Sequence, residues 1–241
     1  QAQGGDHVLA ETGHGGGTLR YADHAPGLQR LPDGAVVLDN RYTRATGMSP
    51  FILPGMTPTT ADAPIVAAAA NAGHTAELAG GGQPTEHVWW TRMAELAERL
   101  EPGRTFTLNT LLLDPWLWDL QVRRGRLVQK ARKAGYPIAG VTVSAGIPEV
   151  PDAVALLDEL AGLGMTLNAF KPGTVAQVAQ VVRIAKAAPQ HTIYVHVEGG
   201  KAGGHHSWED LEELLLDTYD SLRRQPNVVL CVGGGIGSEA R

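Results

Sequence analysis

One stretch decides the fold of this chain: residues 192–237, TIYVHVEGGKAGGHHSWEDLEELLLDTYDSLRRQPNVVLCVGGGIG. It contains a β-branched apolar run at residues 192–197, a helical pattern at 208–224 and a second β-branched run at 228–232. Two such strands separated by a helix are typical of a βαβ unit, in which the strands run parallel. The stretch therefore predicts a parallel sheet covered by helices.

The same rhythm extends back to residue 51. Five more strand-like runs occur, at residues 51–53, 75–79, 105–111, 138–143 and 166–170. Helical patterns alternate with them at residues 62–72, 86–100, 116–134, 152–163 and 175–188. Unusual Gly, Pro and polar residues follow every strand, which favours a barrel because a barrel gathers all its strand ends around one mouth. An open doubly wound sheet would concentrate them near one switch point.

We therefore predict an α/β fold of the TIM (β/α)8 type, incomplete in this chain, with about seven βα units. Residues 51–241 form the barrel domain, truncated before an eighth unit. Residues 1–50 show no sustained helical or strand period and are interpreted as an N-terminal extension or linker from a larger polypeptide.

Composition excludes several classes of protein. Hydrophobic residues make up 43% and charged residues 19% of the 241, which excludes a disordered chain. Twenty Lys and Arg against 25 Asp and Glu give a net charge of −5, which argues against nucleic-acid binding. The single cysteine, Cys231, excludes a disulfide framework and suits a reducing cytoplasm. No long apolar stretch suggests a membrane span, so we expect a soluble, cytoplasmic protein with no metal site.

The loop at residues 199–207, GGKAGGHHS, is the most informative candidate site. Its four glycines allow the backbone to approach a flat or anionic ligand, and Ser207 is placed to cap the following helix. One of the adjacent histidines, His205 or His206, is able to act as a general acid. The simpler interpretation is a surface turn with solvated histidines.

A second glycine run, at residues 233–237, follows the last strand. The N–H groups of Gly234 and Gly235 suit a phosphate, and barrels frequently hold phosphate at the loops after their last strands. A tight turn is the alternative.

Polar residues inside or after other strands add candidates. Asn109 is an amide on a strand otherwise fit for burial, so it needs partners, which either a ligand or a neighbouring loop is able to supply. Lys171 ends a strand and is either an electrostatic or Schiff-base residue or a surface lysine. Glu77 and Glu198 are either site carboxylates or paired core charges. If the barrel forms, we expect one cavity bounded by Gly81, Asn109, Lys171, His205 and Gly234.

Six motifs in series now identify a resemblance. They are Pro54-Gly55-Met56-Thr57-Pro58-Thr59-Thr60, Glu77-Leu78-Ala79-Gly80-Gly81-Gly82, Leu108-Asn109, Ala145-Gly146-Ile147-Pro148, Phe170-Lys171-Pro172-Gly173 and Gly203-Gly204-His205-His206-Ser207. Together they resemble the enoyl reductase domain of type I fatty acid synthases, of the fungal and actinobacterial kind. The resemblance runs from about Asp39 to Gly237.

This resemblance implies a flavoprotein enzyme of fatty acid biosynthesis that binds FMN at the barrel mouth, takes electrons from NADPH and reduces a trans-2-enoyl thioester. It implies an acyl carrier protein domain as the bearer of the substrate, other fatty acid synthase domains as partners, and a homo-oligomeric assembly. The implied catalytic residues are His205 and Lys171. The implied cofactor-binding residues are Gly55, Met56, Thr57, Asn109, Lys171, Gly203, Gly204, Gly234 and Gly235.

Two other functions stay open at this point. The chain is also similar to flavin barrels of the nitronate monooxygenase type, in which His205 would act as a base and oxygen would accept the electrons. Alternatively, it is a non-catalytic structural segment of a multienzyme synthase.

Overall fold

The computed structural model describes residues 20, 22, 24–204 and 207–236. The chain separates into two compact units, Gln1–Pro50 and Phe51–Arg241. None of the helices in the described ranges is long and apolar enough to cross a membrane.

The first unit contains regular structure that the sequence reading did not predict. An antiparallel hairpin pairs β1 (Gly27–Arg30) with β2 (Val36–Asp39), and the helix α1 (Arg41–Thr46) follows. The strands are four residues long and almost wholly exposed, so they carry no alternation of buried and exposed positions for a pattern to detect. Local contacts define the hairpin turn, where the Gly34 N–H donates to the carbonyl of Leu31 at 2.9 Å.

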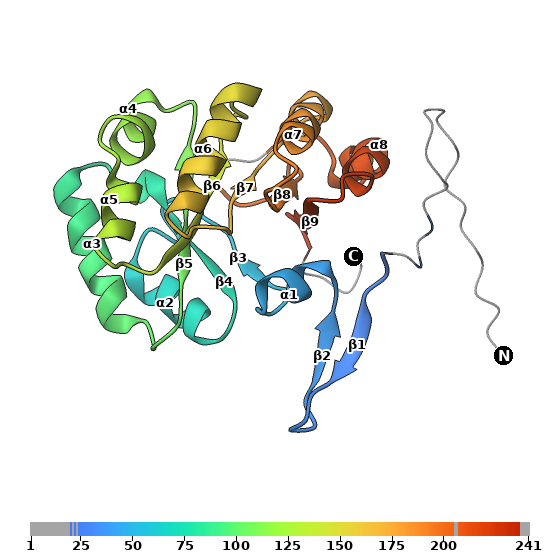
Figure 1. Ribbon diagram of the computed structural model, residues 1–241, viewed down its shortest axis with the longest axis horizontal. Helices are drawn as coiled ribbons and strands as arrows, with labels where there is room; N and C mark the ends of the chain where they lie inside the picture. The colour runs from blue at the N-terminus through green and yellow to red at the C-terminus, as the bar shows by residue number, and fades with distance from the viewer. Residues whose placement is uncertain (1–19, 21, 23, 205–206, 237–241) are drawn as a thin grey trace. The chain divides into compact units, whose positions relative to one another are not determined.

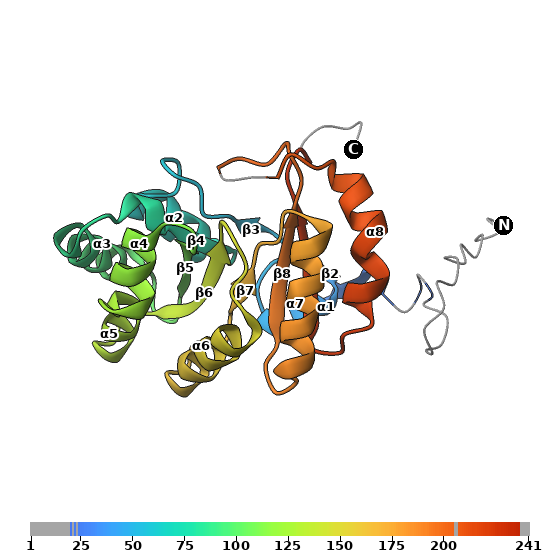
Figure 2. The same ribbon diagram turned by 90° about the horizontal axis from the view of Figure 1, so that it is seen from above.

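The second unit is built on a seven-stranded parallel sheet whose strands lie in chain order. They are β3 (Ile52–Leu53), β4 (Thr75–Ala79), β5 (Phe106–Leu111), β6 (Ile138–Ser144), β7 (Ala169–Phe170), β8 (Ile193–Glu198) and β9 (Val228–Gly233). The helices between them are α2 (Ala63–Asn71), α3 (Glu86–Arg99), α4 (Pro115–Trp118), α5 (Leu127–Lys133), α6 (Val150–Gly162), α7 (Val175–Ala187) and α8 (Leu211–Arg223). The sheet curls into a half-barrel with helices on its outer face (Figures 1 and 2). The prediction of an incomplete TIM-type α/β fold is confirmed.

Alternation along the strands gives the two faces of the sheet different environments. Ala76 and Leu78 of β4 belong to the core packed under the helices, as do Val141 and Val143 of β6. Residues between them point to the opposite, inner face, because side chains alternate along a strand. Those inner residues are polar yet buried, and Glu77 is 0% exposed. The inner face is therefore where polar chemistry gathers.

The helix predicted over residues 116–134 is broken into three pieces, so this prediction was wrong. The helix α4 leads into a π-helical turn at Asp119–Arg123, and α5 starts only at Leu127. Arg126 has a left-handed backbone, with φ of 56°. A Cβ on Gly125 would lie 2.2 Å from the carbonyl oxygen of Leu120, so this turn tolerates only glycine at that position. A helical hydrophobic pattern does not reveal such a break.

Two other boundaries differ from the prediction because side chains replace backbone hydrogen bonds. β7 is shorter than residues 166–170, since the amide oxygen of Asn168 accepts a hydrogen bond from the N–H of Val141 at 3.0 Å. The last helix is capped by Asp210 and not by Ser207. The hydroxyl of Ser207 instead donates to the carbonyl of Gly173.

Candidate active site

Polar side chains from neighbouring strands meet around Glu77 on the inner face. Its Oε2 accepts hydrogen bonds from the Gly55 N–H at 2.7 Å and from Asn109 Nδ2 at 3.2 Å. Its Oε1 accepts from the hydroxyl of Thr142 and lies 3.6 Å from Nδ1 of His196. A single buried carboxylate thus ties the loop after β3 to strands β5, β6 and β8.

The Glu77 carboxylate is stabilised as an ion. Burial by itself raises its pKa, but the charges at His196 and Lys171 and the bonds from Thr142 and Gly55 together leave the pKa below its usual value. Burial is also the main influence on His196, and it lowers that pKa below 6.5 despite the nearby Glu77. At pH values where His196 is neutral, the charge of Lys171 and the hydrogen bonds from Thr142 and Gly55 remain to favour the ionised carboxylate of Glu77.

Lys171 lies beside this network in a second buried pair. Its Nζ is 3.1 Å from Oε1 of Glu198, and the two side chains are only 7% and 12% exposed. The backbone N–H of Lys171 donates to Val143 at 3.0 Å, which fixes the lysine at the end of β7. Lys171 is therefore not a surface lysine, and both Glu77 and Glu198 are paired charges.

Asn109 has protein partners, so its amide does not need a ligand to satisfy it. Besides the bond to Glu77, its Oδ1 accepts from the hydroxyl of Ser144 at 2.8 Å. The loop after β3 lies directly against it, since a Cβ on Gly55 would be 2.2 Å from the Asn109 Cβ. Only glycine at position 55 permits this approach.

The glycine-rich loops after several strands also lie against one another. A Cβ on Gly81 would be 2.5 Å from Oγ1 of Thr57, and one on Gly203 would be 2.6 Å from Sδ of Met56. A Cβ on Gly234 would be 2.8 Å from that of Ala202. The loops after β3, β4, β8 and β9 therefore form one continuous surface at the carboxyl ends of the strands.

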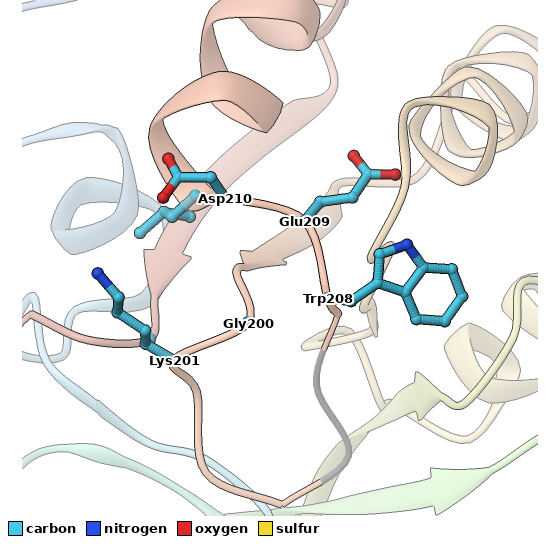
Figure 3. A pocket seen from close by; sticks show the side chains of 7 residues that line it. Gly200, Lys201, Trp208, Glu209 and Asp210 are labelled. Atoms are coloured by element: carbon cyan, nitrogen blue, oxygen red, sulfur yellow. The ribbon is translucent and has the colours of Figure 1, made fainter.

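This surface contains separate cavities, so the expectation of one common cavity was wrong. An inner cavity of about 10 Å³ is lined by Gly55, Thr57, Gly81, Asn109 and Lys171, among others. A hollow of about 270 Å³ is lined by Gly200, Lys201, Trp208, Glu209, Asp210, Leu211 and Gly234. The two cavities share no lining residue among those described. Figure 3 shows the hollow, with the Lys201 and Trp208 side chains extending to opposite sides of Gly200.

Comparison with known proteins finds similarity to one family. Residues 192–241 match a family described as fatty acid synthase subunit beta/Fas1-like, helical. The fatty acid synthase β subunit of Saccharomyces cerevisiae is 34% identical over 218 residues, which cover 90% of this chain and 10% of that protein. The corresponding subunit of Schizosaccharomyces pombe is 37% identical over 216 residues, covering 89% of this chain and 10% of that protein.

This chain is a homologue of one segment of the fungal fatty acid synthase β subunit. The resemblance to the synthase family that the motifs indicated is therefore confirmed. The chain spans about 10% of the length of the curated relatives it matches. Its fold is similar to that of the enoyl reductase domain of MlnA from the macrolactin cluster of Bacillus amyloliquefaciens. The TM-score is 0.61 at 12% identity, and the match covers 82% of this chain and 51% of that one.

Most of the residues that the sequence proposed for the site of this synthase homologue lie in the loop surface. The group comprises Gly55, Met56, Thr57, Asn109, Lys171, Gly203, Gly204 and Gly234. Gly235 is exposed and lines neither of the two cavities above. His205, the proposed catalytic histidine, and its neighbour His206 lie outside the described residues.

Sequence reasoning missed His196, Thr142 and Ser144 as members of the site. A signal for them exists in the strands themselves. His196 alternates with the apolar Val195 and Val197, and Thr142 lies between Val141 and Val143. In a barrel, polar residues at every second position of a buried strand point inward. The alternation along these strands could therefore have predicted that His196 and Thr142 face the inside of the barrel.

Proposed function

We propose that this chain carries the enoyl reductase activity of a multienzyme fatty acid synthase. The reaction would be reduction of a trans-2-enoyl thioester, borne by an acyl carrier protein domain, with electrons from NADPH passing through FMN. The observation that carries the proposal is the 34% identity to a fatty acid synthase β subunit over 90% of this chain. The six motifs and the fold shared with an enoyl reductase domain support this activity among those of a synthase.

The residues present suit a flavin by their chemistry. Lys171 and Asn109 offer a cation and an amide beside backbone N–H groups at the mouth, and Lys201 with Gly234 offers a phosphate site in the larger hollow. Glu209 and Asp210 also line that hollow, so Lys201 offsets only one of their two negative charges, and a phosphate there would have to bind against Lys201 and the Gly234 N–H. The inner cavity of about 10 Å³ admits about one water. The flavin ring would therefore have to bind outside this inner cavity, against the loop surface.

FMN, when bound, would supply the hydride that goes to the β-carbon of the thioester. The reduction places negative charge on the thioester oxygen and requires a proton at the α-carbon. Lys171 is held by Glu198 and has further N–H protons to donate toward that charge. His205 would deliver the proton. Asn109 would present its amide at the mouth in a single orientation, because Glu77 and Ser144 bond both of its ends.

The same proposal implies partners, an assembly state and a location in the cell. We expect an acyl carrier protein domain and other synthase domains as partners, a homo-oligomeric assembly and a cytoplasmic location.

The test uses the full-length polypeptide that contains this chain, purified with FMN. NADPH oxidation is followed with crotonyl thioester and, in parallel, oxygen consumption is followed with a nitronate in the absence of NADPH. The proposal expects oxidation that depends on the enoyl thioester and a flavin absorbance that co-purifies. Oxidation with the nitronate alone would assign the chain to the nitronate monooxygenase type, and no flavin with no oxidation would leave a structural segment.

A further inference from the structure

Two apolar side chains stand almost fully exposed at the mouth of the half-barrel. Leu113, in the loop after β5, is 75% exposed, and Trp208, in the loop before α8, is 88% exposed. Single exposed apolar residues are common on protein surfaces. These two, however, line the same pocket, which has a volume of about 370 Å³ and lies within the usual range for small-molecule sites.

Each of the two side chains belongs to a loop that is held by its own hydrogen bonds. The N–H of Leu113 donates to the carbonyl of Ala145 at 3.1 Å, and a Cβ on Gly146 would lie 3.1 Å from Cγ of Leu113. Trp208 follows Ser207, whose hydroxyl donates to the carbonyl of Gly173 and accepts from the N–H of Glu209 at 2.9 Å. The hydrogen bonds of the Leu113 backbone and of the Ser207 hydroxyl therefore hold the two loops that carry the apolar rim.

The pocket connects to the candidate chemistry through one residue. Lys171 lines both this pocket and the inner cavity that also contains Asn109 and Gly55. A molecule in the pocket thus lies beside the lysine to which the reduction is assigned. This location favours a substrate over a ligand that only docks on the surface.

The charged residues that line the pocket indicate which kind of molecule binds there. Glu198 also lines the pocket and is paired with Lys171 at 3.1 Å, so the polar floor carries no net charge. An anionic carboxylate or phosphate would lie close to Glu198 and be repelled. A neutral carbonyl is able to accept a hydrogen bond from the remaining Lys171 protons. An apolar rim above a neutral polar floor suits an acyl chain attached to a thioester carbonyl.

We propose that the pocket formed by Leu113 and Trp208 over Lys171 binds the acyl chain of the thioester substrate and sets the preferred chain length. This inference rests on the enoyl reductase function proposed above. Each methylene buried against the rim adds affinity, so a longer chain gains from the two side chains and a four-carbon chain gains little.

The test compares crotonyl and 2-octenoyl thioesters as substrates of the full-length polypeptide. Leu113→Ala should raise the KM for the eight-carbon substrate about tenfold, with the KM and kcat for the four-carbon substrate within about twofold of wild type. Trp208 also lines the hollow assigned to phosphate, so Trp208→Ala is judged by the ratio of the two KM values, eight-carbon over four-carbon, which should rise about tenfold. Leu216→Ala is the matched control, because Leu216 is 76% exposed on α8 and does not line the pocket. An equal rise for both substrates would overturn the proposal, since the rim would then contact the head group or the carrier.

A second measurement needs no turnover. A saturated octanoyl thioester with a photoreactive group at the chain end is cross-linked to the polypeptide, and the labelled peptides are mapped by mass spectrometry. Labelling of the peptides that contain Leu113 or Trp208 is the expected result, and labelling only elsewhere contradicts the acyl site. Labelling there in a polypeptide that reduces no enoyl thioester would support the acyl site and overturn the reductase function.

Discussion

Among single residues, His196 is a member of the site that the sequence did not indicate, and it lies beside Glu77. Both side chains are buried on the inner face, where an ordinary core would have apolar residues. The pKa of each lies below its ordinary value. Glu77 anchors the Gly55 N–H and the amide of Asn109. A buried, satisfied network of this kind fixes side-chain orientation, which a catalytic surface requires.

The lowered pKa of His196 predicts acid sensitivity. The unfolded chain takes up a proton near pH 6.5 and the folded chain resists it, so stability is lost as pH falls from 6.5 toward the folded pKa. Glu77 adds a loss at lower pH, as its carboxylate is protonated through its own lowered pKa. His196→Gln should therefore flatten the fall in unfolding free energy between pH 7 and 5.5, by up to about 1.4 kcal/mol per pH unit.

Chemical denaturation of the chain at a series of pH values measures this slope. His87→Gln, which removes an exposed imidazole on α3, controls for the loss of a histidine as such. A slope that is the same in His196→Gln and wild type would show that His196 does not titrate differently on folding.

The histidine proposed for proton transfer gives a second prediction at this scale. General acid catalysis contributes about 100- to 10,000-fold, so His205→Ala should lower enoyl turnover within that range. FMN reduction by NADPH should stay near normal, because it needs no proton from His205. Stopped-flow measurement separates the two half-reactions. Slow turnover in His206→Ala together with normal turnover in His205→Ala would move the role to the neighbour.

At the scale of elements, close backbone approach determines how strands and loops pack. A Cβ on Gly140 of β6 would lie 1.9 Å from the backbone oxygen of Leu167, so the segment before β7 packs directly on the strand. Gly140→Ala should lower the unfolding free energy by about 1–3 kcal/mol, the usual cost of overpacking. Gly162→Ala at the end of α6 meets no atom within 4 Å and should be neutral or stabilising. Equal midpoints of denaturation for the two variants would contradict this account of β6.

The loop after β9 gives a prediction about cofactor retention. Gly234 has a φ of 96° and lies against Ala202 beside the hollow assigned to phosphate. Gly234→Leu in the full-length polypeptide should abolish the visible flavin absorbance. Gly34→Leu imposes similar backbone strain at a φ of 88°, with no atom within 4 Å of the added Cβ, and should keep the absorbance. Unchanged flavin in Gly234→Leu would remove the phosphate assignment.

Sequence periodicity predicted these elements well where a strand or helix has its own local pattern of apolar residues. All seven runs from residue 51 onward are strands, because glycine or proline ends the helix before most of them. The break at Gly125 and the short β7 depend on contacts with Leu120 and Asn168, which periodicity does not contain. The candidate site was predicted only in part for the same reason, because its side-chain contacts are not contained in the sequence pattern. The glycine loops were visible as motifs, whereas the partners of Glu77 come from strands 32 to 119 residues away in the chain and needed the fold.

For the whole molecule, the central claim is that the mouth of the half-barrel around Lys171 reduces an enoyl thioester. The parallel strands bring the loops of six motifs to one edge of the sheet, and Lys171 lies where the inner cavity meets the acyl pocket. No single element contains this arrangement, since its residues come from β4, β5 and the loops after β3, β7 and β8.

The most direct test is the reoxidation of the bound flavin by crotonyl thioester in the full-length polypeptide, followed by stopped-flow absorbance in wild type and Lys171→Met. The account predicts rapid reoxidation in wild type and reoxidation at least about 100-fold slower in Lys171→Met, because charge developing on the thioester oxygen loses its donor. The rate is expressed per bound flavin, measured from the absorbance of each protein, so that a loss of flavin is distinguished from slow reoxidation. Reoxidation of Lys171→Met at the wild-type rate, or a wild-type flavin that crotonyl thioester does not reoxidise, would contradict the account.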